Sequence, residues 1–356
     1  MSGHLEGLRV LDLTIWRPGP YATQLLAEQG ADVLKVEPPG GDPMRSMPDL
    51  FDILGAGKRS VVLDLKRDED REQCLELAAS ADVFVESHRP GVAERLGVGH
   101  DAVRARNPAI VYASVSGFGA SGPLAGLPGH DINYLAVSGA LRPLGGDLTH
   151  PTVPISDLAG GVAAAYAITT ACLGARLHGH GERVDVSVTD VLATWVGPVG
   201  PVRMVGVDRP LRGAPGYGAF PTNDGGHVAI GIMNEDHFWV GLCRALDLEE
   251  YERLDNPERN RRLGEINGRI AEVIAALTRA DALERLEAQD VPVSPVLDRE
   301  QMLAHPHFRS RGTVVQTPDG RPGSGPLVRF EHQPGRAPHG APELGAHDAT
   351  WLPRAG

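Results

Sequence analysis

Residues 8–37 read LRVLDLTIWRPGPYATQLLAEQGADVLKVE, and this stretch decides the fold of the first half of the chain. Residues 8–13 form a short apolar run that is typical of a buried strand. The Arg-Pro-Gly-Pro turn at 17–20 then opens a helix over 21–29, which a glycine ends. A second apolar run follows at 31–37. The pattern predicts a β-α-β unit with a right-handed crossover.

The same alternation continues along the chain. More strands are predicted at 60–65, 83–86, 110–115 and 183–188, and helices at 69–79 and 157–177. Strands that alternate with helices favour a mainly parallel sheet covered by helices on its faces, which is an α/β fold. The composition changes at residues 198–218, where Gly and Pro are dense and a crossing between domains is expected. The second region carries predicted strands at 227–232 and 291–296 and predicted helices at 236–246, 261–276 and 280–289. Irregular structure is expected from residue 316 onward.

Composition limits the partners of the chain. Its 356 residues exceed one ordinary core, so two domains are expected. With 34 Lys and Arg against 46 Asp and Glu, the net charge is −12, which argues against nucleic acid and means that an anionic ligand needs a local basic patch. No signal peptide or membrane span is predicted. The three isolated cysteines (Cys74, Cys172 and Cys243) fit a reducing, cytoplasmic setting and give no metal-ligand spacing.

The first β-α-β unit invites comparison with dinucleotide-binding folds, in which Glu37 would bind a ribose hydroxyl. The Gly-x-Gly-x-x-Gly turn is absent, however, because residues 16–20 offer one glycine and two prolines without a backbone N–H. We therefore expect no nicotinamide site, and Glu37 is interpreted as an ordinary carboxylate at the end of a strand.

Four basic residues lie in turns beside predicted strands, where open α/β sheets bind ligands: Arg45, Lys58, Arg59 and Arg89. Guanidinium groups suit phosphate oxygens, so the set is a candidate phosphate site. The alternative interpretation is a group of solvated surface charges.

His130 and Asp157 are the candidate catalytic pair. Each follows a turn and precedes an apolar run that reads as a helix, so an imidazole and a carboxylate at two helix starts can face one pocket from opposite sides. The alternatives are a structural histidine and a helix-capping aspartate. Asp131 is a candidate cap for the helix that follows it, and the N–H groups of that helix start are candidates to stabilise an oxyanion. Glu235 is a candidate to orient His130, or else a solvated residue beside Asp236.

Taken together, the motifs resemble those of the family III CoA-transferases (the CaiB/BaiF superfamily), and within them those of the α-methylacyl-CoA racemases. The similarity runs from about residue 7 to about residue 312. It is carried by residues 8–13 (LRVLDL), 30–39 (GADVLKVEPP), 57–66 (GKRSVVLDLK), 89–97 (RPGVAERLG), 116–123 (SGFGASGP), 129–136 (GHDINYLA), 157–161 (DLAGG), 213–217 (GAPGY) and 293–297 (VSPVL).

The resemblance implies a large Rossmann-like, CoA-binding domain at residues 1–200 and a smaller α/β domain at 201–315. A C-terminal segment, 316–356, is expected to return to the large domain, in an interlocked homodimer. The resemblance also implies an acyl-CoA substrate with no prosthetic group and no metal, its phosphates near the basic turns. Gly117 and Gly119 are expected to line the CoA site.

Two activities follow from the resemblance. In racemases, His130 and Asp157 would exchange the α-proton of a 2-methylacyl-CoA through an enolate, a reaction of lipid metabolism. In transferases, Asp157 would be the nucleophile that moves CoA between carboxylic acids. The Gly-His-Asp-Ile-Asn-Tyr motif favours the racemase, since transferases commonly carry an aromatic residue in place of His130. Residues 233–238 are one residue longer than the racemase pattern, which leaves Asn234 as a rival to Glu235.

Overall fold

The computed structural model describes residues 3–145, 151–196, 213–317, 320–333, 335 and 340–352. Within it the chain forms two compact units. Unit 1 comprises Met1–Pro198 and His307–Gly356, and unit 2 comprises Val199–Pro306. Most of the stretch predicted as a crossing between domains lies outside the described residues, namely residues 198–212.

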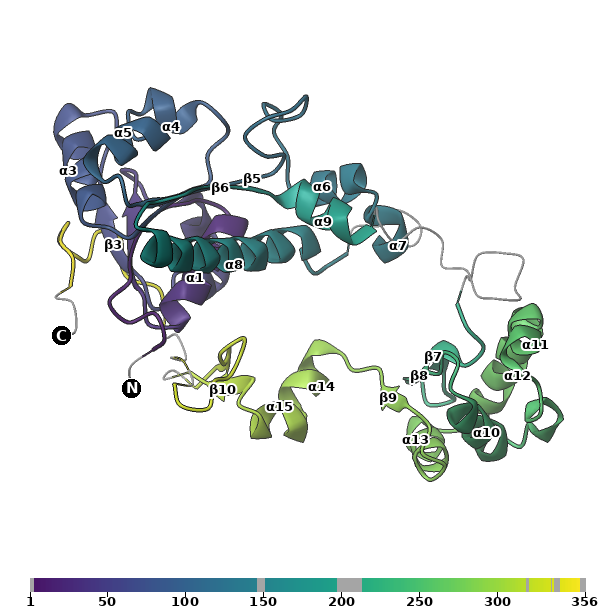
Figure 1. Ribbon diagram of the computed structural model, residues 1–356. Helices are drawn as coiled ribbons and strands as arrows, with labels where there is room; N and C mark the ends of the chain where they lie inside the picture. The colour runs from purple at the N-terminus through teal and green to yellow at the C-terminus, as the bar shows by residue number, and fades with distance from the viewer. Residues whose placement is uncertain are drawn as a thin grey trace. The chain divides into compact units, whose positions relative to one another are not determined.

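Unit 1 is built on a six-stranded, fully parallel sheet in the order β3-β2-β1-β4-β5-β6 (Figure 1). The strands are β1 (Arg9–Leu13), β2 (Asp32–Glu37), β3 (Arg59–Val62), β4 (Val83–Glu86), β5 (Val111–Ser116) and β6 (Arg183–Ser187). The predicted parallel α/β fold is confirmed. The strand order reverses between β1 and β4, and in such sheets ligands bind outside the carboxyl ends of the strands at that point.

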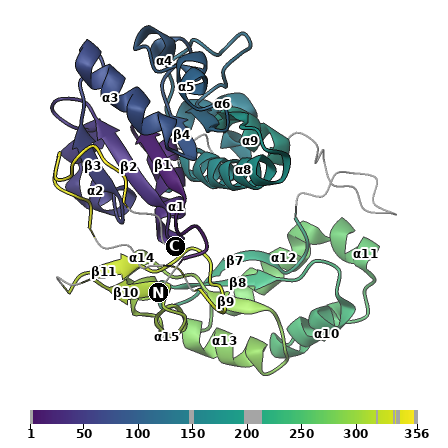
Figure 2. The same ribbon diagram turned by 60° about the vertical axis from the view of Figure 1, so that its left-hand side comes forward.

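Helices cover both faces of this sheet, and the side chains of β1 are buried on each face. Val10 belongs to a core cluster with residues of α1 (Pro18–Glu28) and α8 (Ile155–His178). Its neighbour Leu11 points to the other face, into a cluster with residues of α3 (Asp68–Ala79) and α5 (His100–Arg106). Figure 2 shows α3 and α8 on opposite sides of the sheet. Because successive strand side chains alternate between faces, a strand that is buried on both faces reads as a continuous apolar run.

The shorter elements of unit 1 lie in its connections and in its C-terminal part. They are η1 (Pro43–Ser46), α2 (Pro48–Leu54), α4 (Val92–Arg95), α6 (Asp131–Ser138), α7 (Leu141–Gly145), α9 (Val188–Val196), α15 (Pro306–Ser310), β10 (Val314–Gln316) and β11 (Pro322–Ser324). The last two strands pair as an antiparallel hairpin. The expectation of irregular structure from residue 316 is therefore wrong at residue 316 and at residues 322–324.

The C-terminal segment lies along the edge of the sheet. The backbone N–H of His347 donates to the Ser60 carbonyl in β3 at 3.0 Å, and the N–H of Gly345 donates to the Ser60 hydroxyl at 3.1 Å. The indole of Trp351 donates to the Leu77 carbonyl at the end of α3, at 3.1 Å. These bonds attach residues 345–351 to β3 and α3.

Unit 2 has its own sheet and core. Its strands β7 (Tyr217–Pro221), β8 (His227–Gly231) and β9 (Val293–Pro295) are antiparallel. Its helices are α10 (Asp236–Ala245), η2 (Glu249–Tyr251), α11 (Asn256–Arg261), α12 (Leu263–Ile274), α13 (Arg279–Glu287) and α14 (Arg299–Ala304). Trp239 and Ile270 are fully buried in the core between this sheet and the helices.

Glycines let α8 approach its neighbours closely. A Cβ added to Gly161 would lie 2.9 Å from the Pro18 carbonyl oxygen and 2.7 Å from the Tyr21 ring, both in α1. A Cβ on Gly160 would lie 2.7 Å from the Val188 side chain. By contrast, a Cβ added to Gly174 in the same helix would meet no atom within 4 Å. The glycine pair therefore fixes the close packing of α8, and the third glycine does not.

This contrast gives a matched pair of variants. We expect Gly161→Ala to lower the free energy of unfolding by about 1–3 kcal/mol, because the added methyl forces α1 and α8 apart. Gly174→Ala should raise it by about 0.5–1 kcal/mol, because alanine is the better helix former. Urea unfolding followed by circular dichroism measures both, and equal stability of the two variants would contradict the packing argument.

Candidate active site

His130 is the residue that precedes α6, and its ring is exposed. Its backbone is extended (φ −131°, ψ 177°), and its N–H donates to the Asn133 Oδ1 at 3.0 Å. The imidazole meets the ring of Trp16 edge to face, with the ring centroids 5.8 Å apart and an interplanar angle of 87°. An exposed imidazole that one aromatic neighbour orients is accessible to a ligand.

Asp157 lies in the first turn of α8, and its side chain is 16% exposed. It is not the residue that precedes the helix, since Pro154 holds that position. One oxygen of the carboxylate lies 3.8 Å from the Arg17 Nε. The two candidate catalytic residues are thus each contacted by one of two consecutive residues, Trp16 and Arg17, in the loop that follows β1.

Asp131 joins the two helix starts. Its buried carboxylate accepts hydrogen bonds from the Ser156 N–H at 2.8 Å and the Asp157 N–H at 3.2 Å, and from the Ser156 hydroxyl. Because α8 begins after a proline without a side-chain cap of its own, this carboxylate satisfies N–H groups that the helix leaves open. The expectation that Asp131 caps the helix that follows it is therefore wrong: His130 holds the cap position of α6, Asp131 is the first residue of that helix, and its carboxylate caps α8. His130 and Asp157 are held as neighbours.

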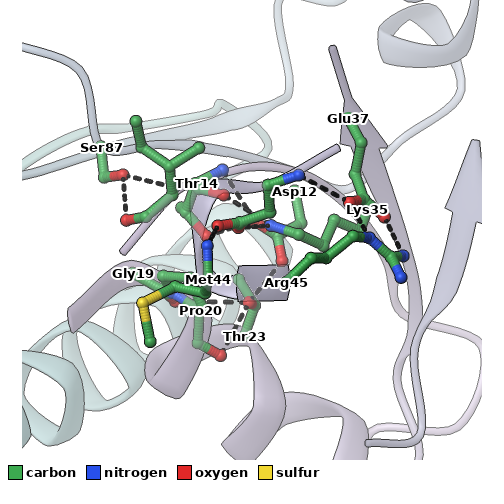
Figure 3. A network of polar contacts seen from close by, with 12 residues as sticks. Asp12, Thr14, Gly19, Pro20, Thr23, Lys35, Glu37, Met44, Arg45 and Ser87 are labelled. Atoms are coloured by element: carbon green, nitrogen blue, oxygen red, sulfur yellow. Dashed lines mark hydrogen bonds and ion pairs between the residues drawn. The ribbon is translucent and has the colours of Figure 1, made fainter. Parts of the chain in front are cut away.

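The loop between β1 and α1 is anchored by a buried polar network, which Figure 3 shows. The Asp12 carboxylate accepts from the Thr14 N–H at 2.9 Å, from the Thr23 hydroxyl at 2.6 Å and from the Lys58 ammonium at 3.0 Å. The Lys35 ammonium donates to the Thr14 carbonyl at 2.6 Å and pairs with Asp42 at 2.8 Å. Thr14 is thereby fixed two residues before Trp16.

The charges of this network are shifted by burial and by one another. Burial alone would raise the pKa of Asp12, but attraction to Lys58 and Lys35 and hydrogen bonds from Thr14 and Thr23 together lower that pKa to about 2. Burial lowers the pKa of Lys58 to about 8, although Asp12 opposes this shift. Burial also disfavours the charged form of Lys35, yet Asp12 and Asp42 outweigh it and raise the pKa. At neutral pH Asp12 and Lys35 are therefore charged, and Lys58 is charged in most molecules.

Most of the four residues predicted to bind phosphate already bond to other groups of unit 1. The Lys58 ammonium is fully buried and uses its three protons on Asp12, Thr23 and the Pro20 carbonyl. This burial contradicts its predicted phosphate role, because no proton is left for a ligand.

The three arginines of that set differ from one another. Arg45 binds both oxygens of Glu37 at 2.7 Å, which makes Glu37 a buried structural carboxylate, as its interpretation from the sequence expects. Arg59 donates to the Thr350 carbonyl at 2.8 Å in the C-terminal segment. Arg89 is exposed, and no carboxylate pairs with it in the part of the chain that the structure describes. The phosphate roles of these arginines stay predictions.

Gly117 and Gly119 shape the loop that leads to His130. A Cβ on Gly117 would lie 2.2 Å from the Tyr134 ring, so only glycine fits beneath this tyrosine, and Gly119 adopts φ +81°. The Tyr134 hydroxyl donates to the Gly129 carbonyl at 2.5 Å. Burial, then the charges of Asp157 and Asp131, raise the pKa of Tyr134 to about 12, so that it stays a hydrogen-bond donor. Contact of the two glycines with CoA stays a prediction.

Glu235 belongs to unit 2, where it precedes α10. Its carboxylate accepts from the N–H groups of Met233 at 2.9 Å and Asn234 at 3.0 Å. Hydrogen bonds from its own N–H and from those two lower its pKa. Asp236 pairs instead with Arg259. The carboxylate thus closes its own turn, and its predicted role toward His130, like that of Asn234, stays a prediction.

Sequence comparisons show the family of the chain. A model of the family described as CoA-transferase family III matches residues 5–348. The chain belongs to that family. Within the described ranges, no group of three or more His, Cys, Asp or Glu residues is arranged to hold a metal ion.

Relatives with two different activities are similar to the chain. It is 33% identical over 345 residues to the α-methylacyl-CoA racemase of Homo sapiens, covering 91% of this chain and 86% of that protein. It is 32% identical over 391 residues to the succinyl-CoA:mesaconate CoA-transferase of Haloarcula hispanica, covering 99% and 97%. Among solved structures, the Mycobacterium tuberculosis protein Rv3272 has a TM-score of 0.87 at 28% identity, covering 99% of each chain. The protein is therefore an enzyme of this family, a racemase or a CoA-transferase.

Trp16 and Arg17 were not predicted as site residues. They contact His130 and Asp157 only because their loop leaves the central strand β1, next to the point where the strand order reverses. Their place after that strand is the signal that identifies them.

The network predicts how stability responds to acid. Since the pKa of Asp12 is lower in the folded chain, its contribution is fully present above about pH 4 and is lost as the pH falls toward 2. The size of the shift corresponds to about 2 kcal/mol. In Asp12→Asn, the free energy of unfolding should be lower at neutral pH and should fall less steeply between pH 4 and pH 2. Urea unfolding across that range measures the slope, with exposed Asp190→Asn as the control, and an unchanged slope in Asp12→Asn would refute the assignment.

Proposed function

We propose that this enzyme epimerises a 2-methylacyl-CoA thioester at its α-carbon. The observation that supports this is the joined pair of helix starts, with the His130 imidazole at one and the Asp157 carboxylate at the other, tied by Asp131. An acid and a base that are fixed as neighbours can serve one carbon, which is what a proton exchange with inversion requires.

The chemistry needs more than a base, because an α-proton beside a thioester is only weakly acidic. In the proposed cycle neutral His130 removes the proton from one epimer, and Asp157 in its acid form delivers a proton to the opposite face. The roles reverse for the other epimer. The thioester oxygen carries the charge of the enolate between the two steps, and backbone N–H groups near Asp131 are the proposed donors to it.

CoA transfer between carboxylic acids is the second candidate, and one contact favours it. The guanidinium of Arg17 beside Asp157 stabilises the anionic carboxylate, which is the form that would attack a thioester carbonyl. In that reaction the carboxylate oxygen forms a bond to the acyl carbon and the thiolate of CoA leaves. His130 would then be a neighbour without a direct role.

An isotope experiment separates the two reactions. The enzyme is incubated with one epimer of a 2-methylacyl-CoA in deuterated water and without a second acid. Racemisation with uptake of α-deuterium is expected, and its rate should fall about 10²–10⁴-fold in His130→Ala and in Asp157→Ala, because each loses one acid–base group. Exposed His180→Ala is the matched control and should retain the wild-type rate.

The opposite results would identify the transferase. If the wild type shows no exchange but moves CoA to an added carboxylic acid, the racemase proposal is wrong. The same holds if His130→Ala racemises as fast as the wild type. A transferase would lose activity in Asp157→Ala and keep most of it in His130→Ala.

We also propose that two chains form a homodimer. Part of α8 supports this: although one side packs on α1 and the sheet, it exposes Tyr166 (72%), Leu173 (59%) and Leu177 (69%). By length and mean hydropathy alone this helix would also qualify as a membrane span. We propose that a second chain covers these exposed side chains of α8, because large exposed apolar patches mark association sites.

Sedimentation equilibrium tests the homodimer. A mass of twice 37.8 kDa is expected for the wild type, with weaker association in the double variant Leu173→Glu, Leu177→Glu. A monomer at micromolar concentration would contradict the proposal. Binding of the wild type to lipid vesicles would show that the apolar side serves a membrane instead.

A further inference from the structure

Arg17 carries a guanidinium whose hydrogen-bonding capacity is unused in the described part of the chain. The Arg17 side chain is 28% exposed, and its one ion-pair contact there, between Nε and the Asp157 carboxylate, is 3.8 Å long. That distance is too great for a hydrogen bond, and a guanidinium has five N–H donors. A half-buried arginine beside a catalytic carboxylate is therefore free to bind an anion.

The backbone of Arg17 is fixed by the residues on both sides of it. On one side, Ile15 exchanges two hydrogen bonds with the Ser87 hydroxyl, at 2.8 Å and 3.1 Å. On the other side, α1 begins at Pro18. Between them Trp16 adopts φ +64°, a left-handed conformation that costs a non-glycine residue energy and persists only where its surroundings impose it. The position of Arg17 is thus built into the loop.

We propose that Arg17 binds a second carboxylate on the acyl group, so that the preferred substrate is the CoA thioester of a short, 2-methyl-branched dicarboxylic acid. This inference rests on the proposed epimerisation. In that cycle Asp157 must carry a proton in one half-reaction, and a guanidinium without another anionic partner opposes the protonated state. A substrate carboxylate facing Arg17 supplies that partner, with the two-pronged geometry that arginine favours.

The contact also limits the length of the acyl chain. Asp157 acts at the α-carbon, and Arg17 lies next to Asp157. The second carboxylate must therefore be near the α-carbon, separated from it by about one or two methylene groups if normal hydrogen-bond distances are kept. A long fatty or steroid chain would instead leave the guanidinium facing apolar atoms, which is unfavourable for a charged group.

Two thioesters of matched length test this substrate class. One is 2-methylglutaryl-CoA with the thioester beside the branch, and the other is 2-methylpentanoyl-CoA, which has a methyl where the first has a carboxylate. The readout is kcat/KM for α-deuterium exchange. We expect wild-type enzyme to prefer the dicarboxylic thioester by roughly 10–100-fold, as a charged hydrogen-bonded pair would give. Arg17→Gln should abolish that preference, because the dicarboxylic substrate loses its partner and the monocarboxylic substrate no longer faces an unpaired guanidinium. Arg17→Lys should restore part of it.

Controls distinguish binding of a substrate carboxylate by Arg17 from binding of the CoA phosphates and from an effect on Asp157 alone. Arg106→Gln removes an exposed guanidinium that pairs with Glu72 on the surface, and it should leave the preference unchanged. If Arg17→Gln slows both thioesters equally, Arg17 serves the CoA phosphates or Asp157 alone, and the inference is overturned. It is also overturned if the wild type shows no preference.

A binding measurement keeps this test independent of the proposed reaction. Two CoA thioethers, with and without the terminal carboxylate, cannot react and are titrated by calorimetry. If neither thioester exchanges its α-proton, epimerisation fails as a function. In that case tighter binding of the carboxylate thioether, lost in Arg17→Gln, would still support the carboxylate site, and equal binding of the two thioethers would reject it.

Discussion

The carboxylate of Asp131 is the interaction on which the site depends. A helix that begins after a proline leaves its first N–H groups without partners, and α8 obtains its cap from the neighbouring helix α6. Because His130 is bonded directly to Asp131, and Asp157 donates its own N–H to it, one side chain sets the spacing of both catalytic candidates. A group that is buried and used this way is costly to replace, since its loss would leave the N–H groups of Ser156 and Asp157 at the start of α8 without this acceptor.

The loop after β1 depends on a second, purely structural arrangement. Asp12, Lys58, Lys35 and Asp42 place two positive and two negative charges in the interior, where each is paired. Pairing is what makes such burial tolerable, because an isolated buried charge would be severely destabilising. The network fixes Thr14. Trp16 and Arg17 follow in the same loop and contact His130 and Asp157. Different residues of this one loop thus stabilise the fold and contact the candidate catalytic residues.

The sequence predicted the sheet well because strands buried on both faces, such as residues 8–13 and 31–37, read as apolar runs between turn residues. It also identified His130 and Asp157, through turns and motifs. It did not predict that Lys58 is enclosed, because a lysine in a Gly-Lys-Arg turn reads the same whether it faces water or a carboxylate 46 residues earlier in the chain. The cap from Asp131 to α8 likewise spans 25 residues, and no local pattern encodes such a pairing.

The attachment of residues 345–351 to β3 has a consequence for biosynthesis. Unit 2 is inserted within unit 1, so the ribosome makes β3 long before the segment that covers its outer edge. An uncovered parallel edge can pair with other chains. The nascent protein therefore carries an open strand throughout the synthesis of unit 2, and protection by a chaperone would matter most during that interval.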